Sequence, residues 1–205
     1  YERWAELGAT GWGWGGVAPY FRRVERFTAG EGAQADPRRG HDGPVGVRQG
    51  RRENPLSGAF LAAAEACGYA VVDDLNGPRQ EAFGPLDMNV ADGLRASSYR
   101  AWLAPVRDRP NLEIRTGRRV ERLQLDATDD GVRASGVVLE DGTVLRARRE
   151  VISAAGSIGS PTLLLRSGIG AAEGLAEAGV APRVELPGVG ENLIDHLEIY
   201  VQQAC

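Results

Sequence analysis

Apolar residues recur at helical spacing in the first half of the chain. They run from Val17 to Phe27 with the neighbouring arginines off that face, which predicts an amphipathic helix. A second helix is expected over Pro55 to Cys67, because Asn54 suits the N-cap and Gly68 suits the end of a helix. Both segments therefore predict helices that turn one apolar face toward a core.

A third helix is expected to start near Ser98, to end by Arg109, and to bury Tyr99, Trp102 and Leu103. The segment from 28 to 43 is rich in Gly, Asp, Arg and Pro and has almost no aliphatic residue. Such a composition is typical of an exposed loop.

From Leu112 onward the apolar positions alternate with a period of two, which is typical of strands. Asp141 and Gly142 lie between two alternating runs and predict a hairpin turn with Gly142 at positive φ. The small apolar run from Val151 to Ala155 is expected inside a sheet covered on both faces. The expected strands are Leu112–Ile114, Val120–Leu125, Val132–Leu139, Thr143–Ala147 and Val151–Ala155.

The segment after this last strand predicts a turn and the start of a helix. Gly156 is expected to turn the chain, Ser160 to cap a helix, and Pro161 to occupy its first position, with the helix running to Gly168. Backbone N–H groups at such a helix start have no intrahelical partner, so they could donate hydrogen bonds to an anion. By spacing alone, the pattern favours a packing turn with nothing bound over an anion site.

Composition and charge narrow the class of protein. The chain has 205 residues, 42% of them hydrophobic and 25% charged, with a formal net charge of −4. These values suit a globular protein and argue against a nucleic-acid-binding surface, which is usually basic. Two His and two Cys nearly exclude a zinc site or a disulfide scaffold. No apolar run reaches the roughly 18 residues of a transmembrane segment.

The residues from Gly156 to Gly170 resemble the second sequence signature of the glucose–methanol–choline (GMC) oxidoreductases at every defined position. Further segments resemble motifs of the same family in the same order, so the resemblance covers nearly the whole chain. These segments are Trp4 with Gly11-Trp12 and Pro19–Phe21, Gly43–Val45, Gly93–Ser97, Arg109–Leu112, and Pro187–His196.

The resemblance implies a mixed α/β fold made of part of a Rossmann-type FAD-binding domain and part of a sheet-and-helix substrate domain. The implied ranges are 1–45 for a connecting segment, 46–110 for the substrate domain, 111–190 for the FAD-binding domain, and 191–205 for a strand returning to the substrate domain. The chain starts without Met and stops in an alternating run that includes Leu197, Ile199 and Val201. We therefore expect an interior fragment of a longer protein.

The resemblance further implies FAD as cofactor and oxidation of a primary or secondary alcohol by hydride transfer to the flavin. The substrate would be a small-molecule alcohol, and the electron acceptor would be oxygen, a quinone or a protein. The catalytic His of the family is expected beyond Cys205 and the dinucleotide fingerprint upstream of Tyr1. The chain is therefore expected to hold no catalytic residue and no metal site, and to be inactive alone.

Four residues are the cofactor-side candidates that the resemblance implies. Val120 matches a position whose backbone contacts the adenine, although a plain buried strand residue would look the same. Ala154, Ala155 and Gly156 match the place where the last Rossmann strand passes the cofactor.

Several other polar residues are of types that can act in catalysis, but their positions in the sequence do not favour such a role. His196 and Asp195 are adjacent on an expected strand and would point to opposite faces, so a structural role is expected for them. His41 lies in a polar loop and is expected to be solvated. Asp73 and Asp74 are expected to be solvated loop charges as well.

Two alternatives to a flavoenzyme remain open. The first is a non-catalytic flavin-binding or structural relative that kept the fold and lost the base. The second is a nicotinamide-dependent dehydrogenase, which would need a glycine fingerprint within the domain, and none occurs after an expected strand of this chain.

Overall fold

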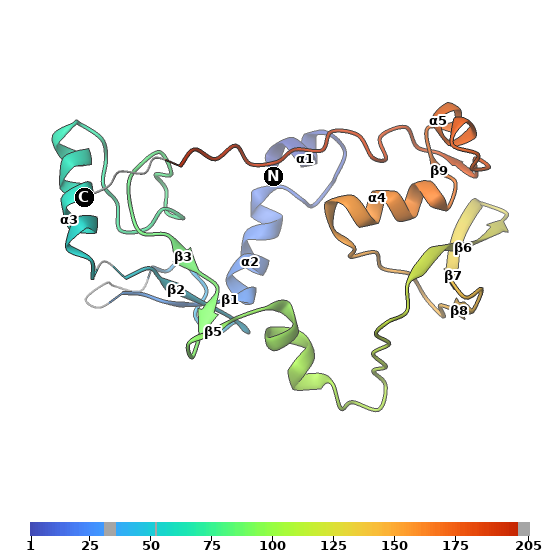
Figure 1. The fold of residues 1–205 in the computed structure, drawn as a ribbon, viewed down its shortest axis with the longest axis horizontal. Helices are drawn as coiled ribbons and strands as arrows, with labels where there is room; N and C mark the ends of the chain where they lie inside the picture. The colour runs from blue at the N-terminus through green and yellow to red at the C-terminus, as the bar shows by residue number, and fades with distance from the viewer. Residues whose placement is uncertain (31–35, 52, 201–205) are drawn as a thin grey trace. The chain divides into compact units, whose positions relative to one another are not determined.

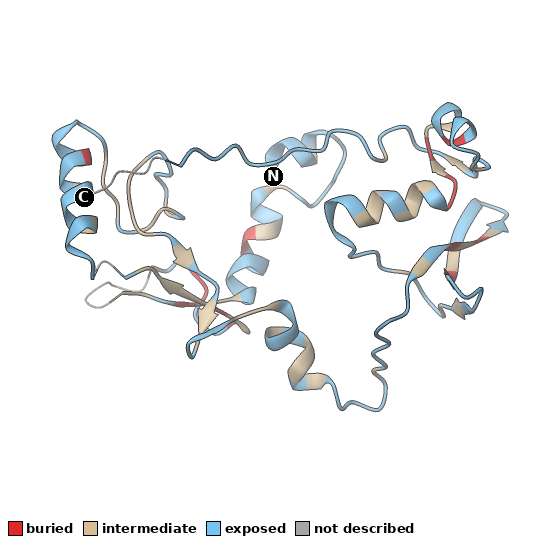
Figure 2. Ribbon diagram, in the orientation of Figure 1, coloured by how far each residue is buried: buried red, intermediate tan, exposed pale blue. Residues whose placement is uncertain are grey.

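The computed structural model describes residues 1–30, 36–51 and 53–200. The chain divides into two compact units, Tyr1–Ile114 and Arg115–Cys205, which are described separately below. Figure 1 shows mixed helices and strands in both units, which confirms the expected α/β class. No described side chain is fully buried, so both cores are shallow (Figure 2).

Helices and very short strands make up the first unit. Its three-stranded sheet has the order β1-β2-β3, with β1 parallel to β2 and β3 antiparallel to β2. A separate hairpin joins β4 to β5. The elements are α1 (Glu2–Glu6), α2 (Trp14–Val24), β1 (Glu25–Thr28), β2 (Val45–Gln49), α3 (Pro55–Ala66), β3 (Asp87–Met88), β4 (Val90–Ala91), β5 (Leu94–Arg95), a π-helical turn (Tyr99–Leu103) and a 3-10 turn (Ala104–Val106).

The two helices expected first are present, with one change of boundary. α2 ends at Val24, and Phe27 belongs to β1, where its N–H donates to the Gly40 carbonyl at 2.8 Å. The N-cap of α3 is confirmed, because the Asn54 side chain accepts the Leu56 N–H at 2.9 Å. Pairing with the returning chain therefore decides where α2 stops, and a local cap decides where α3 starts.

Two expectations for the end of this unit are wrong. The third helix is only a π-helical turn followed by a 3-10 turn, and both Tyr99 and Trp102 keep 50% of their surface exposed. No strand forms over 112–114, because no neighbouring strand in the described chain pairs with this segment. Alternation alone does not make a strand without a partner.

The second unit is built on an antiparallel meander of order β6-β7-β8. Its buried apolar side chains are Leu123, Leu125, Val138, Leu139 and Leu175. The Asp141-Gly142 hairpin is confirmed, with Gly142 at φ +81°. The elements are β6 (Val120–Thr128), β7 (Gly131–Leu139), β8 (Val144–Arg146), α4 (Gly156–Arg166), β9 (Ile169–Gly170), α5 (Ala172–Glu177) and β10 (Val184–Glu185).

One hydroxyl ties α4 to the meander of the second unit. Ser167 follows α4, is buried, and accepts the Leu123 N–H at 2.8 Å while donating to the Leu163 carbonyl at 2.6 Å. A buried hydroxyl is stable only when its hydrogen bonds are made inside the protein. Ser167 thus fixes the C-terminal end of α4 against β6.

Three sequence expectations fail in the second unit. Residues 151–155 form no strand and are not covered on both faces, since Ile152 is 80% exposed. α4 begins at Gly156 rather than after Ser160, so Pro161 lies inside the helix. Residues 197–200 are exposed and form no strand, and Val201 lies outside the described residues. The two expected strands, 151–155 and 197–200, have no neighbouring strand within the described residues.

Candidate functional site

The corner in front of α4 brings together three of the four cofactor-side candidates. Ala154 and Ala155 lie in the exposed chain that enters the helix, and Gly156 is its first residue at φ +79°. A side chain other than glycine rarely adopts this left-handed conformation. An ideal Cβ at Gly156 would meet no atom within 4 Å, so the surface in front of the helix is open.

Two serines explain why α4 starts earlier than expected. The Ser160 hydroxyl accepts the Ala155 N–H at 3.0 Å and also the Ser153 hydroxyl at 3.0 Å. Ser160 therefore holds the turn before the helix instead of capping a later start. Pro161 is the sixth of the eleven residues of α4, and because proline has no N–H the helix lacks one backbone hydrogen bond at this point.

The start of α4 offers backbone donors to an anion. The helix has no side-chain cap and no acidic residue in its first turn. The first N–H groups of a helix have no intrahelical acceptor, and the helix dipole adds positive potential at that end. The corner thus combines donors, small residues and an open approach, all of which suit an anionic group.

Val120 opens β6 and is partly buried. It pairs with Leu139 of β7 in the register of the meander. Its burial and pairing are those of an ordinary strand residue, and Val120 belongs to the same unit as the α4 corner.

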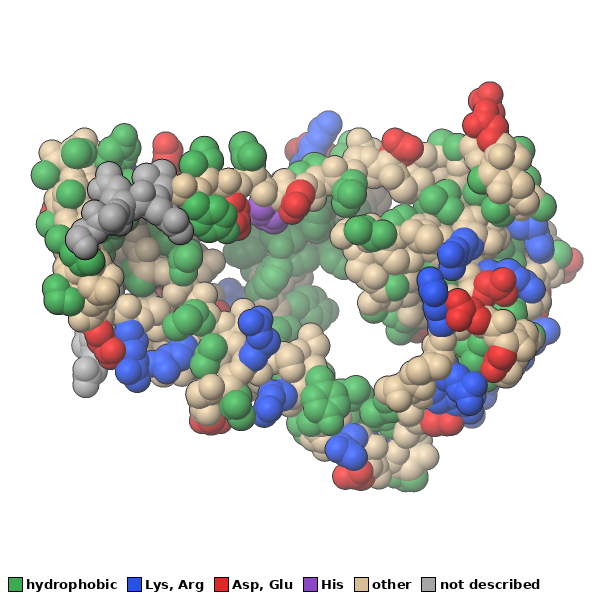
Figure 3. Space-filling view, in the orientation of Figure 1, with side chains coloured by type: hydrophobic (Ala, Val, Ile, Leu, Met, Phe, Trp, Pro, Cys, Tyr) green, Lys and Arg blue, Asp and Glu red, His purple; other side chains and the backbone are tan. Residues whose placement is uncertain are grey.

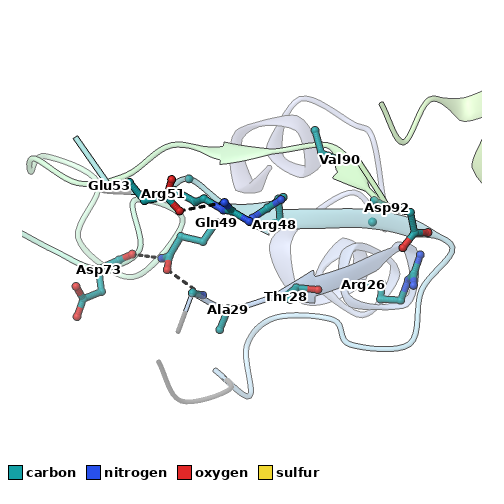
Figure 4. A pocket seen from close by; sticks show the side chains of 14 residues that line it. Arg26, Thr28, Ala29, Arg48, Gln49, Arg51, Glu53, Asp73, Val90 and Asp92 are labelled. Atoms are coloured by element: carbon teal, nitrogen blue, oxygen red, sulfur yellow. Dashed lines mark hydrogen bonds and ion pairs between the residues drawn. The ribbon is translucent and has the colours of Figure 1, made fainter. Parts of the chain in front are cut away.

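The first unit carries a hollow of about 870 Å3 beside its three-stranded sheet (Figure 4). Arg26 and Thr28 of β1 lie on one side of it, and Val90 of β4 and Asp92 lie close by. Gly46 is in its wall, where a Cβ would come within 2.6 Å of the Ala91 Cβ. The close packing of β4 on β2 therefore requires a glycine at this position.

Residues at the other end of the hollow are linked to one another by polar contacts. The Gln49 amide accepts the Gly30 N–H at 3.2 Å and donates to the Asp73 carbonyl, and Arg51 pairs with Glu53 at 3.0 Å. The lining mixes positive and negative side chains, and no His or Cys is among the described residues that line it. The hollow therefore offers charge and hydrogen bonds, without an imidazole to abstract a proton.

A buried ion cluster lies close to the same sheet, and no local sequence pattern predicts it. The guanidinium of Arg39 contacts Glu25, Asp74 at 2.9 Å and Asp87 at 2.8 Å, and its Cζ lies 3.8 Å from the centre of the Phe27 ring. Its side chain is only 8% exposed. Asp74 is therefore part of this cluster, which corrects the expectation that it is a solvated loop charge.

The cluster keeps Arg39 charged. Burial by itself lowers the pKa of Arg39, but the hydrogen bonds that it donates to Glu25, Asp87 and Asp74 more than offset this, and the net pKa lies above its usual value. Three carboxylates from β1, β3 and the segment between α3 and β3 meet one cation. The cluster thus joins segments that are far apart in the sequence.

The two histidines lie apart from these sites. His41 is exposed, with its ring Nε2 at 3.2 Å from the Asp36 carbonyl. His196 and Asp195 lie in the exposed segment after β10, and the Asp195 carboxylate accepts the His196 backbone N–H at 2.9 Å. That bond uses the His196 backbone rather than its ring, so the structure shows no imidazole–carboxylate dyad here.

The described part of the chain was searched for metal-ligating groups and for membrane-spanning helices. No group of three or more His, Cys, Asp and Glu residues there could hold a metal ion. None of the helices in that part has the length and apolar character needed to cross a membrane.

Comparison with curated proteins gives matches that cover the whole of this chain. Oxygen-dependent choline dehydrogenase of Brucella anthropi is 44% identical over 208 residues, which cover all of this chain and 36% of the relative. The enzyme of the same name from Photobacterium profundum is 45% identical over 210 residues, with the same coverage. The chain thus spans about a third of the length of the curated relatives it matches.

Solved structures match the fold. An FAD-dependent oxidoreductase from Chaetomium thermophilum aligns with a TM-score of 0.82 and 27% identity over 92% of this chain and 34% of its own. Pyridoxine 4-oxidase from Mesorbium loti aligns with a TM-score of 0.77 and 32% identity over 91% of this chain and 36% of its own.

A family model agrees with these matches and with the motifs of the sequence. The model of the GMC oxidoreductases matches residues 1–198, which is nearly the whole chain. The chain therefore belongs to the GMC oxidoreductase family.

Proposed function

We propose that the chain is part of an FAD-dependent oxidoreductase that oxidises the CH–OH group of a small alcohol. The observation that carries this proposal is the 44% identity to oxygen-dependent choline dehydrogenase along the whole chain. The pyridoxine 4-oxidase and the FAD-dependent oxidoreductase among the structural matches support the same class of reaction. Choline and pyridoxine are accordingly the first alcohols to try.

We assign the cofactor side to the second unit. The N–H groups at the start of α4 would donate to a phosphate group of FAD, and Ala154, Ala155 and Gly156 would let the cofactor approach the backbone. Val120 would offer its backbone to the adenine. When bound, the flavin supplies the hydride acceptor, and the protein supplies position and electrostatics.

The domain ranges follow from the same assignment. Residues 111–190 would belong to the FAD-binding domain, residues 46–110 to the substrate domain, residues 1–45 to a connecting segment, and residues 191–205 to a strand of the substrate domain. The proton-abstracting His would come from a part of the longer polypeptide beyond Cys205, where the resemblance places it together with a His or Asn partner.

Anaerobic reduction of the flavin tests the proposal. The longer polypeptide that contains these residues is purified, its flavin spectrum is recorded, and choline, pyridoxine and a set of aliphatic and aromatic alcohols are added without oxygen. Bleaching of the flavin by at least one alcohol supports the proposal. Bound flavin that no alcohol bleaches would identify the non-catalytic relative, and a protein without flavin would contradict both.

A second experiment identifies the electron acceptor. After reduction by the alcohol, oxygen, a quinone or a dye that mimics a protein acceptor is added to separate samples. The curated relatives are named as oxygen-dependent, so we expect oxygen to restore the flavin spectrum. Restoration by the quinone or the dye alone would place the protein among the dehydrogenases.

A further inference from the structure

The segment between α3 and β3 contains a dipeptide with a chemistry of its own, Asn76-Gly77. The chain has five asparagines, and only Asn76 is followed by a glycine. In such a pair the backbone nitrogen of the glycine can attack the side-chain amide carbon of the asparagine, because glycine has no side chain in the way. Asn76 is exposed, so water can reach it.

The attacking nitrogen of this pair is held by Asp74. The Gly77 N–H donates to the Asp74 carbonyl at 3.1 Å, and the Asp74 carboxylate accepts the Asn76 N–H at 2.8 Å. A carboxylate that accepts the N–H two residues further on forms an Asx turn, which fixes the backbone there. A Cβ at residue 77 would come within 2.9 Å of the Asp74 carbonyl oxygen, so the turn requires this glycine.

The amide that would be attacked is held by Asp87. The side-chain nitrogen of Asn76 donates to the Asp87 carboxylate at 2.8 Å. The side chain of Asp87 is only 10% exposed, and its other oxygen is buried with no hydrogen-bond partner among the described residues. The contacts of this carboxylate therefore come from Asn76 and Arg39.

Arg39 contacts both of the carboxylates that hold the dipeptide. Its guanidinium lies 2.9 Å from the Asp74 carboxylate and 2.8 Å from the Asp87 carboxylate. For the attack to occur, the Gly77 nitrogen must leave the Asp74 carbonyl and the Asn76 amide must leave Asp87. The reaction therefore requires the segment to open locally, and Arg39 opposes that opening.

We propose that Asn76 is a deamidation site whose rate is set by the ion cluster around Arg39. The Gly77 nitrogen bonds to the side-chain carbon of Asn76 and gives up its proton, the carbon–nitrogen bond of the amide breaks, and ammonia leaves. Water then opens the resulting succinimide ring, so that residue 76 becomes aspartate or isoaspartate. Water is the only co-reactant, and nothing is oxidised or reduced.

The product of this reaction adds a negative charge next to Asp87. A carboxylate in place of the Asn76 amide cannot donate to Asp87, and the two like charges repel each other. The acidic side chains in view in Figure 3 lie on the surface, where water weakens such repulsion. Deamidation therefore weakens the cluster that slows it.

Timed peptide mapping of the longer polypeptide tests the proposal. The protein and its variants are kept in mildly alkaline buffer, samples are digested at low pH, and mass spectrometry measures the fraction converted at Asn76. A synthetic peptide of residues 72–80 gives the rate without the fold. We expect the wild-type protein to convert about tenfold more slowly than the peptide, and Arg39→Ala to approach the peptide rate, because the segment then opens more often.

Two further variants keep the test decisive if Arg39→Ala does not fold. Asp87→Asn removes the charge that accepts the Asn76 amide and leaves Arg39 in place, so it should raise the rate severalfold. Leu139→Ala is the control, because it removes a buried side chain of the second unit and should leave the rate at Asn76 unchanged.

The effect of the product is measured with Asn76→Asp and Asn76→Ala. Both variants lose the hydrogen bond to Asp87, and only the first adds a charge. The urea midpoint of Asn76→Asp should therefore be lower than that of Asn76→Ala. These readouts are masses and unfolding midpoints that need no turnover, so failure of this proposal and failure of the proposed function are distinguishable.

Four results would overturn the proposal. Conversion of the wild-type protein as fast as the peptide would show that the fold does not control the reaction. Rates that neither Arg39→Ala nor Asp87→Asn raises would exclude the cluster as the cause. An equal rise in Leu139→Ala would assign the reaction to global unfolding. Equal urea midpoints for the two Asn76 variants would show that the product does not weaken the cluster.

Discussion

The two units of the chain are stabilised in different ways. In the second unit, five aliphatic side chains from β6, β7 and α5 form the buried core, and Ser167 ties α4 to it. In the first unit, the buried side chains are Ala18, Phe27, Ala64 and Arg39, and the three carboxylates that Arg39 contacts are partly buried. One unit therefore depends on apolar packing and the other on a charge cluster.

The two kinds of stabilisation also differ in how far apart in the sequence the contacting residues lie. β6, β7 and β8 follow one another, so their core forms from local hairpins whose pattern can be read along the chain. Arg39 contacts Asp87, which lies 48 positions away. An ion pair over that distance leaves no periodic trace in the sequence.

The largest expected effect is that of Arg39→Ala. Removing the guanidinium leaves three carboxylates together in a mostly buried place, and breaking a buried ion pair from one side costs about 4 kcal/mol. Urea unfolding followed by hydrogen exchange should show the loss in β1 and β2, with β6 and β7 unchanged.

The control for this variant is its neighbour, Arg38→Ala. Arg38 pairs with Asp36, and its side chain is 57% exposed, so solvent screens the pair and the expected loss of stability is much smaller. If both variants lose the same stability, the charge cluster does not hold the first unit together.

A core truncation makes the matching test in the second unit. Leu139 is 4% exposed, and Leu139→Ala should cost about 3 kcal/mol through lost burial and the cavity left behind. Val144→Ala in the neighbouring strand removes a side chain that is 46% exposed and should cost much less. Similar losses for the two variants, measured by urea unfolding, would argue against a packed core on the covered face of β6 and β7.

Two glycines sharpen the comparison at a smaller scale, because neither would meet an atom within 4 Å on gaining a Cβ. Gly142 has φ +81°, so Gly142→Ala should destabilise the hairpin by about 1 kcal/mol. Gly58 lies inside α3 without a positive φ, so Gly58→Ala should stabilise the protein by about 0.5–1 kcal/mol. Thermal unfolding measures both, and effects of the same sign would contradict the backbone account.

The smallest effect is a pH dependence from the exposed face of the meander. Hydrogen bonds from Gln124, Ser135 and Arg146 lower the pKa of Asp126 from 3.8 to about 2. A carboxyl whose pKa is lower in the folded state stabilises the protein above its unfolded pKa and loses this contribution as the pH falls through the folded value. Stability from Asp126 should therefore be lost between about pH 4 and pH 2.

An NMR titration of the Asp126 carboxyl checks this expectation, with a midpoint expected near the folded value. Asp126→Asn should flatten the stability profile in that window. A midpoint at the ordinary aspartate value, or an unchanged profile in the variant, would show that the contact with Arg146 is not maintained in solution.

Elements with local causes could be predicted from the sequence. The cap at Asn54 and the turn at Gly142 depend on the conformational preferences of residues within a few positions, and both are confirmed. The strands of the meander alternate because each has a neighbouring strand and one covered face. The family could be identified because its motifs occur in order along the chain.

Other features could not be predicted, for physical reasons. Residues 112–114, 151–155 and 197–200 carry apolar residues in extended patterns, but a strand needs a partner and the described chain supplies none. Arg38 and Arg39 are adjacent arginines in the same polar segment, and nothing in the local sequence distinguishes them. Arg39 is nevertheless buried and Arg38 is exposed. The cluster around Arg39 depends on tertiary contacts that no local pattern encodes.

The most direct test of the proposed role of the second unit is hydrogen exchange in the longer polypeptide with and without FAD. The assignment of the cofactor side to Val120, Ala154, Ala155 and Gly156 predicts that FAD slows exchange at the start of α4 and at the start of β6. It also predicts little change around Arg39 in the first unit. Slower exchange confined to the first unit, or no change at α4 in a protein that binds FAD, would contradict the account.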